Sequence, residues 1–351
     1  MPTVPHYWDS FETYAVGDGA DADVGLGISG DVRIQSDRSR TGDHSIALAG
    51  GGAATLGAAM SVAVPSSPHV VLNMHVFAGG FSTIQRAVVD FRTGTTLKAR
   101  VSIDSGPTLT LRVLNTIVAT ASTAPPTGAQ YWEVIYYSHA TSGYFALYID
   151  GIEFVRFDGD TVGAAGDVDN VVIRSGHPTT SFTLVSQWNF DDVVAAVVTG
   201  GEIGDPAADV RLGSVVHSVV VPTGDVTSQG TPSAGSDNFA MVNDLPQDGD
   251  TTHVEFAATG DKDLYSHGST LPVDTAPIGV KVTSIQRLPS GGTTQVRHLV
   301  DNVSTEAQGS DEGVGGDYAA QSHRWAQSPF TSGAWTKAEV EALRFGVEAR
   351  S

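Results

Sequence analysis

The chain contains no cysteine. This absence excludes a disulfide framework, thiolate metal sites and thiol nucleophiles in one step. It does not assign a compartment, because a cysteine-free chain suits an oxidising or a reducing setting equally well.

Basic residues are also scarce. Lysine and arginine together number 19, against 39 aspartates and glutamates, and the formal net charge is −20. Such a surface repels a phosphate backbone, so nucleic-acid binding is excluded as the main role of the chain. Attraction to anionic membranes is excluded for the same reason.

Long apolar runs are missing as well. The longest uninterrupted one, Val193 to Val198, is too short to cross a bilayer. The first residues lack the basic and apolar regions of a secretory signal. The sequence therefore predicts a soluble product without membrane insertion, which does not leave the cell through an ordinary secretory signal.

What the sequence does contain is a pattern of short strands. Turns rich in glycine and proline separate apolar segments, several of which alternate with period two, as Leu109, Leu111 and Val113 do. The first 320 residues show no convincing amphipathic helix. The chain is therefore expected to be all-β, with two packed sheets in its first part.

The length of 351 residues predicts two domains, because it exceeds what one hydrophobic core usually organises. A stretch rich in glycine, proline and aspartate over residues 199–210 marks the boundary. We expect a sandwich over residues 1–200, a linker over 201–210 and a second β-rich domain over 211–351. A short helix is expected near the end, where Thr336 and Glu339 form a capping box.

A tight hairpin is predicted at "YFALYIDGIEFVRF". Asp-Gly between two alternating apolar runs favours a type I′ turn, because both central residues of that turn need positive φ. Pairing across the Asp150–Gly151 turn places Ile149 opposite Ile152 and Leu147 opposite Phe154.

Five segments carry a family resemblance: "DSFETYAVGD", "SIALAGGGAATL", "YWEVIYY", "YFALYIDGIEFVRFDGDT" and "WNFDDVVAAVV". In this order, over residues 1–200, they resemble the concanavalin A-like, laminin-G-type jelly-roll sandwich found in virion proteins of tailed phages. The later segments "DLPQDGDTTHVEFAATGDKDLYSH" and "WTKAEVEALRFGVE" resemble the module that follows such sandwiches in phage minor tail and tail-fibre proteins. The resemblance thus implies a jelly-roll sandwich followed by a second β-rich domain with one short C-terminal helix.

The same resemblance implies a structural component of the phage particle, with the tail favoured over the capsid surface. Its partners would be other virion proteins and a glycan on the host cell surface. Fibre-like relatives imply a homo-oligomer, with a trimer favoured. A head fibre or capsid decoration protein is the alternative within this class, because fold likeness alone does not identify a ligand.

Catalytic motifs of this fold are missing from the sequence. A glycosidase needs two carboxylates across one sugar bond, and laminarinase-like relatives place them as Glu-x-Asp-x-x-Glu, a spacing that does not occur here. A Gly-x-Ser-x-Gly nucleophile motif is also missing. We therefore predict no catalytic or cofactor-binding residues and no enzymatic activity; a carbohydrate-active hydrolase on the same fold is the alternative from another class.

Calcium is the metal that the sequence favours, because aspartate-rich turns supply hard oxygen ligands. The candidate ligands are Asp191 and Asp192. Similar turns occur over residues 18–25 and 248–250, although none forms a complete EF-hand loop; the alternative is that all three are solvated turns without a metal.

Three tyrosines are the candidate carbohydrate ligands. Tyr137, Tyr144 and Tyr148 belong to two neighbouring strand segments, and an exposed aromatic ring can stack on the apolar face of a pyranose. Alternation along a strand sends about half of such side chains into the core.

Overall fold

The computed structural model describes residues 3–9, 26–29, 31–35, 45–49, 59–78, 86–104, 108–163, 166–174, 188–198, 211–213, 215–245, 248–288 and 294–351. The chain divides into two compact units, Met1–His217 and Ser218–Ser351. The expected linker, residues 201–210, lies outside the described residues. In the described part of the chain, no helix is long and apolar enough to cross a membrane.

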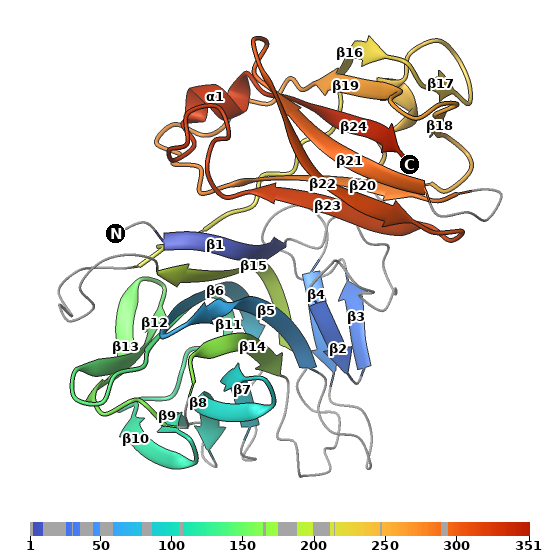
Figure 1. Ribbon diagram of the computed structural model, residues 1–351. Helices are drawn as coiled ribbons and strands as arrows, with labels where there is room; N and C mark the ends of the chain where they lie inside the picture. The colour runs from blue at the N-terminus through green and yellow to red at the C-terminus, as the bar shows by residue number, and fades with distance from the viewer. Residues whose placement is uncertain are drawn as a thin grey trace. The chain divides into compact units, whose positions relative to one another are not determined.

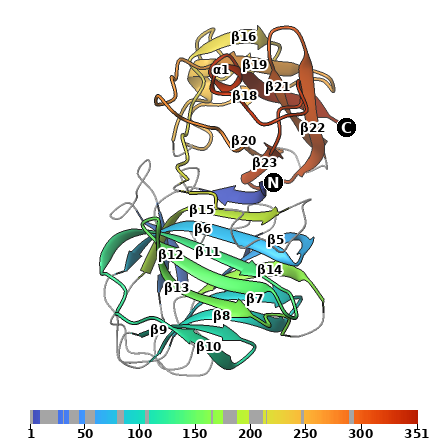
Figure 2. The ribbon, with the colours of Figure 1, turned by 90° about the vertical axis from the view of Figure 1, so that its left-hand side faces the viewer.

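The first unit is a sandwich of two antiparallel sheets (Figure 1 and Figure 2). The eight-stranded sheet has the order β13-β12-β11-β6-β15-β4-β3, and β1 pairs with β15. Its strands are β1 (Thr3–Asp9), β3 (Asp31–Gln35), β4 (Ser45–Ala49), β6 (His69–Ala78), β11 (Gly128–Tyr137), β12 (Gly143–Ile149), β13 (Ile152–Gly159) and β15 (Trp188–Val198).

The seven-stranded sheet has the order β10-β9-β8-β7-β14-β5-β2. Its strands are β2 (Leu26–Ser29), β5 (Ala59–Ser67), β7 (Arg86–Thr93), β8 (Thr96–Asp104), β9 (Thr108–Val113), β10 (Thr116–Thr120) and β14 (Val168–Arg174). The neighbours β7, β8 and β9 are consecutive in the chain, whereas β14 joins β7 from a distant part of the sequence.

The core lies between the two sheets, because alternate side chains of each strand point inward. Leu109 of β9 is fully buried, as its alternation predicts. Phe91 of β7 stacks on Tyr136 of β11 with ring centroids 5.3 Å apart, which joins the two sheets. Trp132 and Trp188 meet edge to face at 5.8 Å within the eight-stranded sheet. Such aromatic pairs add about 0.5–1.5 kcal/mol each beyond the area they bury.

The predicted hairpin connects β12 and β13. Both central residues of the Asp150–Gly151 turn have positive φ, 50° and 80° respectively, as a type I′ turn requires. The pair beside the turn is Ile149 with Ile152, as predicted.

The pairing expected for Leu147 is wrong. Leu147 faces Val155 rather than Phe154, because a β-bulge follows the Tyr148–Glu153 pair and shifts the register by one residue. Val155 therefore points into the core, and Arg156 comes to lie opposite Ala146.

The second unit contains a five-stranded antiparallel sheet of order β16-β19-β24-β21-β22 and two two-stranded sheets, β17-β18 and β20-β23 (Figure 1). The strands are β16 (Gly224–Ser228), β17 (Thr231–Pro232), β18 (Val254–Glu255), β19 (Lys262–Ser266), β20 (Val280–Gln286), β21 (Thr294–Asp301), β22 (Glu306–Val314), β23 (Ala319–Trp325) and β24 (Arg344–Arg350). A 3-10 turn, η1, spans Phe239–Met241.

The single α-helix of the described residues, α1 (Lys337–Glu341), begins where the capping box predicts. The Thr336 side chain accepts a hydrogen bond from the Glu339 amide, and the Glu339 carboxylate accepts one from the Thr336 amide. Trp335 packs in the core of the unit and donates its indole N–H to the Trp325 carbonyl at 2.8 Å. The expected fold class is confirmed: a jelly-roll sandwich followed by a β-rich unit with one short helix.

Candidate functional site

The three predicted tyrosines lie together on the outer face of the eight-stranded sheet, the face that points away from the sandwich core. Tyr137 of β11 pairs directly with Tyr144 of β12, and Tyr148 lies four residues further along β12. Tyr137 and Tyr144 are only 4% and 9% exposed, whereas Tyr148 is half-buried. Tyr148 is therefore the member of the three with ring surface left for a sugar.

His69 of β6 explains the packing of the two buried rings. The hydroxyl of Tyr144 lies 2.9 Å from Nε2 of His69, and the imidazole lies 5.3 Å from the Tyr137 ring. Burial lowers the pKa of His69 to about 4, so the imidazole is neutral at pH 7. These three side chains form a packed cluster rather than an open platform.

The same outer face carries a segment of the chain that follows the sandwich strands, the tether (residues 211–213 and 215–217). Glu133 of β11, which is fully buried, holds it. The carboxylate of Glu133 accepts hydrogen bonds from Arg211 Nε at 2.8 Å and from the amides of Leu212 and Gly213 at 2.5 and 3.2 Å. The Arg211 guanidinium in turn lies 4.1 Å from the centroid of the Tyr148 ring. The tether therefore covers part of the predicted sugar platform.

Two further polar side chains of the sheet contact the tether. The Gly213 carbonyl accepts a hydrogen bond from Asn73 Nδ2 at 2.6 Å and another from the Tyr131 hydroxyl. Burial raises the pKa of Glu133, and the Arg211 hydrogen bond and charge only partly offset that effect. A raised pKa suits a general acid. However, both carboxylate oxygens of Glu133 accept hydrogen bonds from the tether, so the role of Glu133 is to hold the tether on the sheet.

The predicted calcium ligands lie at a β-bulge in β15. Asp191 and Asp192 are both fully buried, and Asp192 has a positive φ of 48°. Asp192 Oδ1 accepts hydrogen bonds from the backbone amide and Nδ1 of His217, at 3.1 and 2.9 Å, so this pair also contacts the tether. The described residues contain no group of three or more histidine, aspartate or glutamate side chains placed to hold a metal. Calcium at Asp191 and Asp192 stays a prediction.

The outer face of the seven-stranded sheet carries a cluster of arginines around one buried aspartate. Asp90 of β7 is fully buried, and three arginines surround its carboxylate. Arg100 of β8 donates from Nε to Oδ1 at 2.5 Å and from Nη2 to Oδ2 at 3.0 Å. Arg92 Nη2 and Arg174 Nε donate to Oδ2 at 2.7 and 3.0 Å. One carboxylate thus neutralises one of three guanidinium groups.

A fourth arginine extends this cationic face. Arg112 of β9 is the direct cross-strand partner of Arg100, and it donates to Asp104 at 3.0 Å. Like charges directly opposite each other destabilise a sheet, but each arginine here has its own aspartate partner, which offsets the repulsion. We name Arg92, Arg100, Arg112 and Arg174, with their aspartates, the arginine face.

The sequence reasoning missed the arginine face, although a signal was present. Each of the four neighbouring strands β7, β8, β9 and β14 carries an arginine at an outward position. In a chain with only 19 basic residues, this repetition marks one sheet as cationic. What the sequence alone could not supply is the position of β14 beside β7, which brings Arg174 to Asp90.

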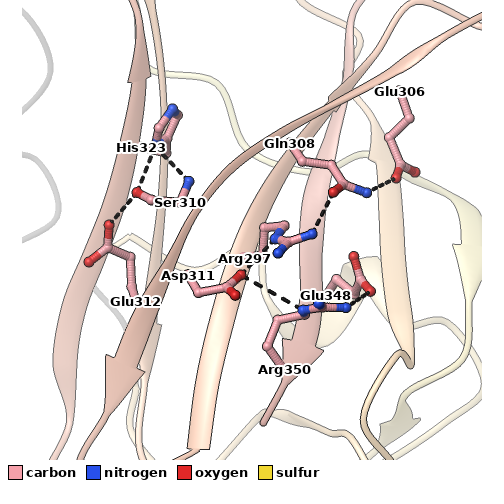
Figure 3. Close-up of polar contacts among 9 residues, drawn as sticks. All are labelled: Arg297, Glu306, Gln308, Ser310, Asp311, Glu312, His323, Glu348 and Arg350. Carbon is pink, nitrogen blue, oxygen red and sulfur yellow. Dashed lines mark hydrogen bonds and ion pairs between the residues drawn. The ribbon is translucent and has the colours of Figure 1, made fainter.

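The second unit has a polar face of its own on the five-stranded sheet (Figure 3). Arg297 donates to Asp311 at 2.6 Å and also to Gln308. Arg350 donates to Glu348 at 3.0 Å and lies 3.7 Å from Asp311. Cations and carboxylates alternate across the neighbouring strands, so this network is charge-balanced and ties β22 to both β21 and β24.

Ser310, Glu312 and His323 lie beside this network (Figure 3), where they combine the residue types of a hydrolytic triad. The Ser310 hydroxyl donates to Glu312 at 2.8 Å and lies 3.4 Å from Nδ1 of His323. In a triad the carboxylate contacts the histidine and the histidine contacts the serine, whereas here the carboxylate contacts the serine. This arrangement therefore stabilises the contact between β22 and β23 without the order of a proton relay.

No known protein family matches the sequence, and no curated protein does. Among solved structures, the chain is similar to the binding domain of botulinum neurotoxin DC in complex with SialylT, at 8% identity and a TM-score of 0.39 over 56% of this chain and 48% of that one. It is also similar to domain 4 of AbnA, a GH43 extracellular arabinanase from Geobacillus stearothermophilus in complex with arabinotriose, at 12% identity and a TM-score of 0.38 over 56% and 94%.

A third similar structure is a Bacillus subtilis protein with a galectin-like fold, at 14% identity and a TM-score of 0.38 over 56% of this chain and 98% of that one. The chain spans about half the length of the neurotoxin binding domain.

Proposed function

We propose that the chain is a non-enzymatic adhesion protein of a tailed-phage particle, in which the sandwich binds a glycan of the host surface through the arginine face. The phage assignment is supported by the sequence resemblance over residues 1–200 and 211–351. As in that resemblance, a place on the tail is favoured, and a capsid decoration protein is the alternative.

The choice of face is supported by one observation. The outer face of the eight-stranded sheet holds the tether on Glu133 and packs Tyr137 and Tyr144 among neighbouring side chains. The outer face of the seven-stranded sheet instead presents guanidinium groups whose hydrogen-bonding capacity exceeds that of their aspartates. Charged donors with unused hydrogen-bonding capacity can orient a glycan at a binding surface.

The buried carboxylates of the sandwich support binding over hydrolysis. Burial opposes the ionisation of Asp90, but the hydrogen bonds and charges of its arginines outweigh burial and lower the pKa of Asp90. Asp90 is therefore ionised at pH 7 and cannot donate a proton. Glu133 is fully buried beneath the tether, whereas a glycosidase needs two carboxylates on either side of one accessible sugar bond.

Adhesion of this kind gains strength from copy number. With a net charge of −20, the whole chain has no long-range attraction to a negatively charged envelope, so each contact is short-ranged and weak. We propose that the chain acts as a homo-oligomer, with a trimer favoured, because linked copies raise avidity without new contacts. Calcium at Asp191 and Asp192 would order the β15 bulge rather than contact the glycan.

Cell binding and sugar release, measured on the same material, test this proposal. The full-length chain, displayed on beads at controlled density, is incubated with a panel of bacterial strains and with their isolated surface polysaccharides, with and without a calcium chelator. We expect binding to a subset of strains and no release of reducing sugars. Release of sugars, or no binding to any strain or polysaccharide, contradicts the proposal.

A further inference from the structure

The arginine face has an excess of positive charge that the described residues do not neutralise. Its four arginines face two aspartates, Asp90 and Asp104. Among these six side chains the arginines therefore outnumber the aspartates by two, in a chain whose formal net charge is −20.

The excess charge lies on the accessible atoms. The side chain of Asp90 is 0% exposed, whereas those of Arg92, Arg100 and Arg174 are 19%, 11% and 12% exposed. The carboxylate is thus hidden beneath the guanidinium groups that it holds. A molecule that approaches Asp90 therefore meets the edges of its three arginines, whereas Asp104, beside Arg112, is itself 20% exposed.

Arg174 has the most hydrogen-bonding capacity to spare. It contacts Asp90 through Nε alone, and among the described residues its two terminal nitrogens have no partner. Arg92 contacts the same Asp90 oxygen through Nη2 and Nε, so its Nη1 is likewise unused in the described part. A guanidinium with two free terminal nitrogens has the geometry that binds an oxyanion through two parallel hydrogen bonds.

We propose that Arg174 and Arg92 bind the oxyanion of an acidic glycan, which specifies the ligand class of the proposed adhesion function and rests on it. The shared chemistry is an anionic group on a sugar, either the carboxylate of a hexuronic acid or a phosphate ester. The ligand supplies the negative charge that the arginine face lacks, and its hydroxyls remain available to neighbouring side chains.

Asp90 is a positioning residue in this arrangement. Its two oxygens hold the Nε edges of Arg100 and Arg174, which leaves the two terminal nitrogens of Arg174 without a partner among the described residues. The partial burial of Arg174 and the nearby charges of Arg92 and Arg100 lower the pKa of Arg174, an effect that a bound anion reverses.

Titration calorimetry on the full-length chain tests the inference with three probes: an oligogalacturonate, a neutral oligogalactose of equal length and a glycerol-phosphate oligomer. We expect binding of the oligogalacturonate or the phosphate oligomer and none of the neutral probe, with affinity that falls as salt rises. Arg92→Gln with Arg174→Gln should lose about tenfold or more in affinity for each charge-assisted contact removed. The matched control, Arg156→Gln, removes an arginine from the outer face of the opposite sheet and should bind as the wild type does.

Arg174→Lys provides a second variant in case the double variant does not fold. It keeps the charge but loses the two-pronged geometry, so partial loss of affinity at an unchanged melting midpoint supports the inference. Equal binding of acidic and neutral probes, or full affinity in a folded Arg174→Gln variant, overturns the proposed ligand class but leaves the proposed adhesion function intact. The proposed adhesion function fails in a different way, because then the chain binds neither cells nor any of the three probes.

Discussion

Asp90→Asn should be among the most destabilising conservative substitutions in the sandwich. The amide has nearly the same shape as the carboxylate, but it cannot compensate the charge of Arg92, Arg100 and Arg174, which all donate to Asp90. Removing one partner from a buried ionic cluster costs about 3–5 kcal/mol, because the remaining charges are left uncompensated. For a unit of this size each kcal/mol lowers the melting midpoint by about 2–4 °C, so a decrease of about 10 °C is expected.

The effect of this substitution should depend on pH in a defined direction. The pKa of Asp90 in the folded state lies below its ordinary value of 3.8. A lowered pKa means that the carboxylate stabilises the fold above the unfolded-state pKa, and that this contribution is lost as the pH falls through the folded-state pKa. The difference in melting midpoint between wild type and Asp90→Asn should therefore be complete at pH 7 and shrink below about pH 4.

Calorimetry of the sandwich transition measures both effects, and Asp104→Asn is the matched control. Asp104 is 20% exposed, and solvent screens its ion pair with Arg112, so its replacement should cost about 1 kcal/mol or less. Sulfate should also restore part of the stability lost in Asp90→Asn, since an anion can occupy the vacated charge. Equal midpoints for wild type and Asp90→Asn at pH 7 would refute the reasoning.

Three further substitutions test other parts of the account. Gly151→Val forces a β-branched residue to φ near 80° and should cost about 1–3 kcal/mol, so an unchanged melting midpoint would count against the turn. Glu133→Gln should cost about 1–3 kcal/mol by leaving Arg211 without its charged partner, and should speed proteolysis within residues 199–217; wild-type resistance there would show that Glu133 does not hold the tether. Thr336→Ala removes the helix cap and should cost about 1 kcal/mol in urea unfolding of the second unit, and no shift in its midpoint would contradict the capping role.

Local patterns predicted much of the fold. The alternation of Leu109 and its neighbours, the Asp150–Gly151 turn and the capping box at Thr336 each depend on residues close together in sequence, and the structure confirms them. Such features follow from strand period, positive φ and hydrogen bonds to the first turn of a helix. They need no knowledge of distant contacts.

Features that depend on tertiary context could not be predicted in the same way. The bulge beyond Tyr148 changes the partner of Leu147, and nothing in the alternating pattern marks it. The three tyrosines were predicted on two neighbouring strand segments, but the burial of Tyr137 and Tyr144 depends on His69 from another strand. The tether contacts Glu133 across about 80 residues of sequence. The convergence of Arg174 and Arg92 on Asp90 likewise requires the order of strands in the sheet.

Which face of the sandwich carries adhesion is the central claim, and one measurement of cell binding addresses it. Wild type, Arg174→Gln and Tyr148→Ala, each folded and displayed on beads at equal density, are compared on a strain that the wild type binds. Loss of binding in Arg174→Gln together with wild-type binding in Tyr148→Ala is the result that the arginine face predicts. Loss in Tyr148→Ala with full binding in Arg174→Gln would contradict it and assign adhesion to the tyrosine face.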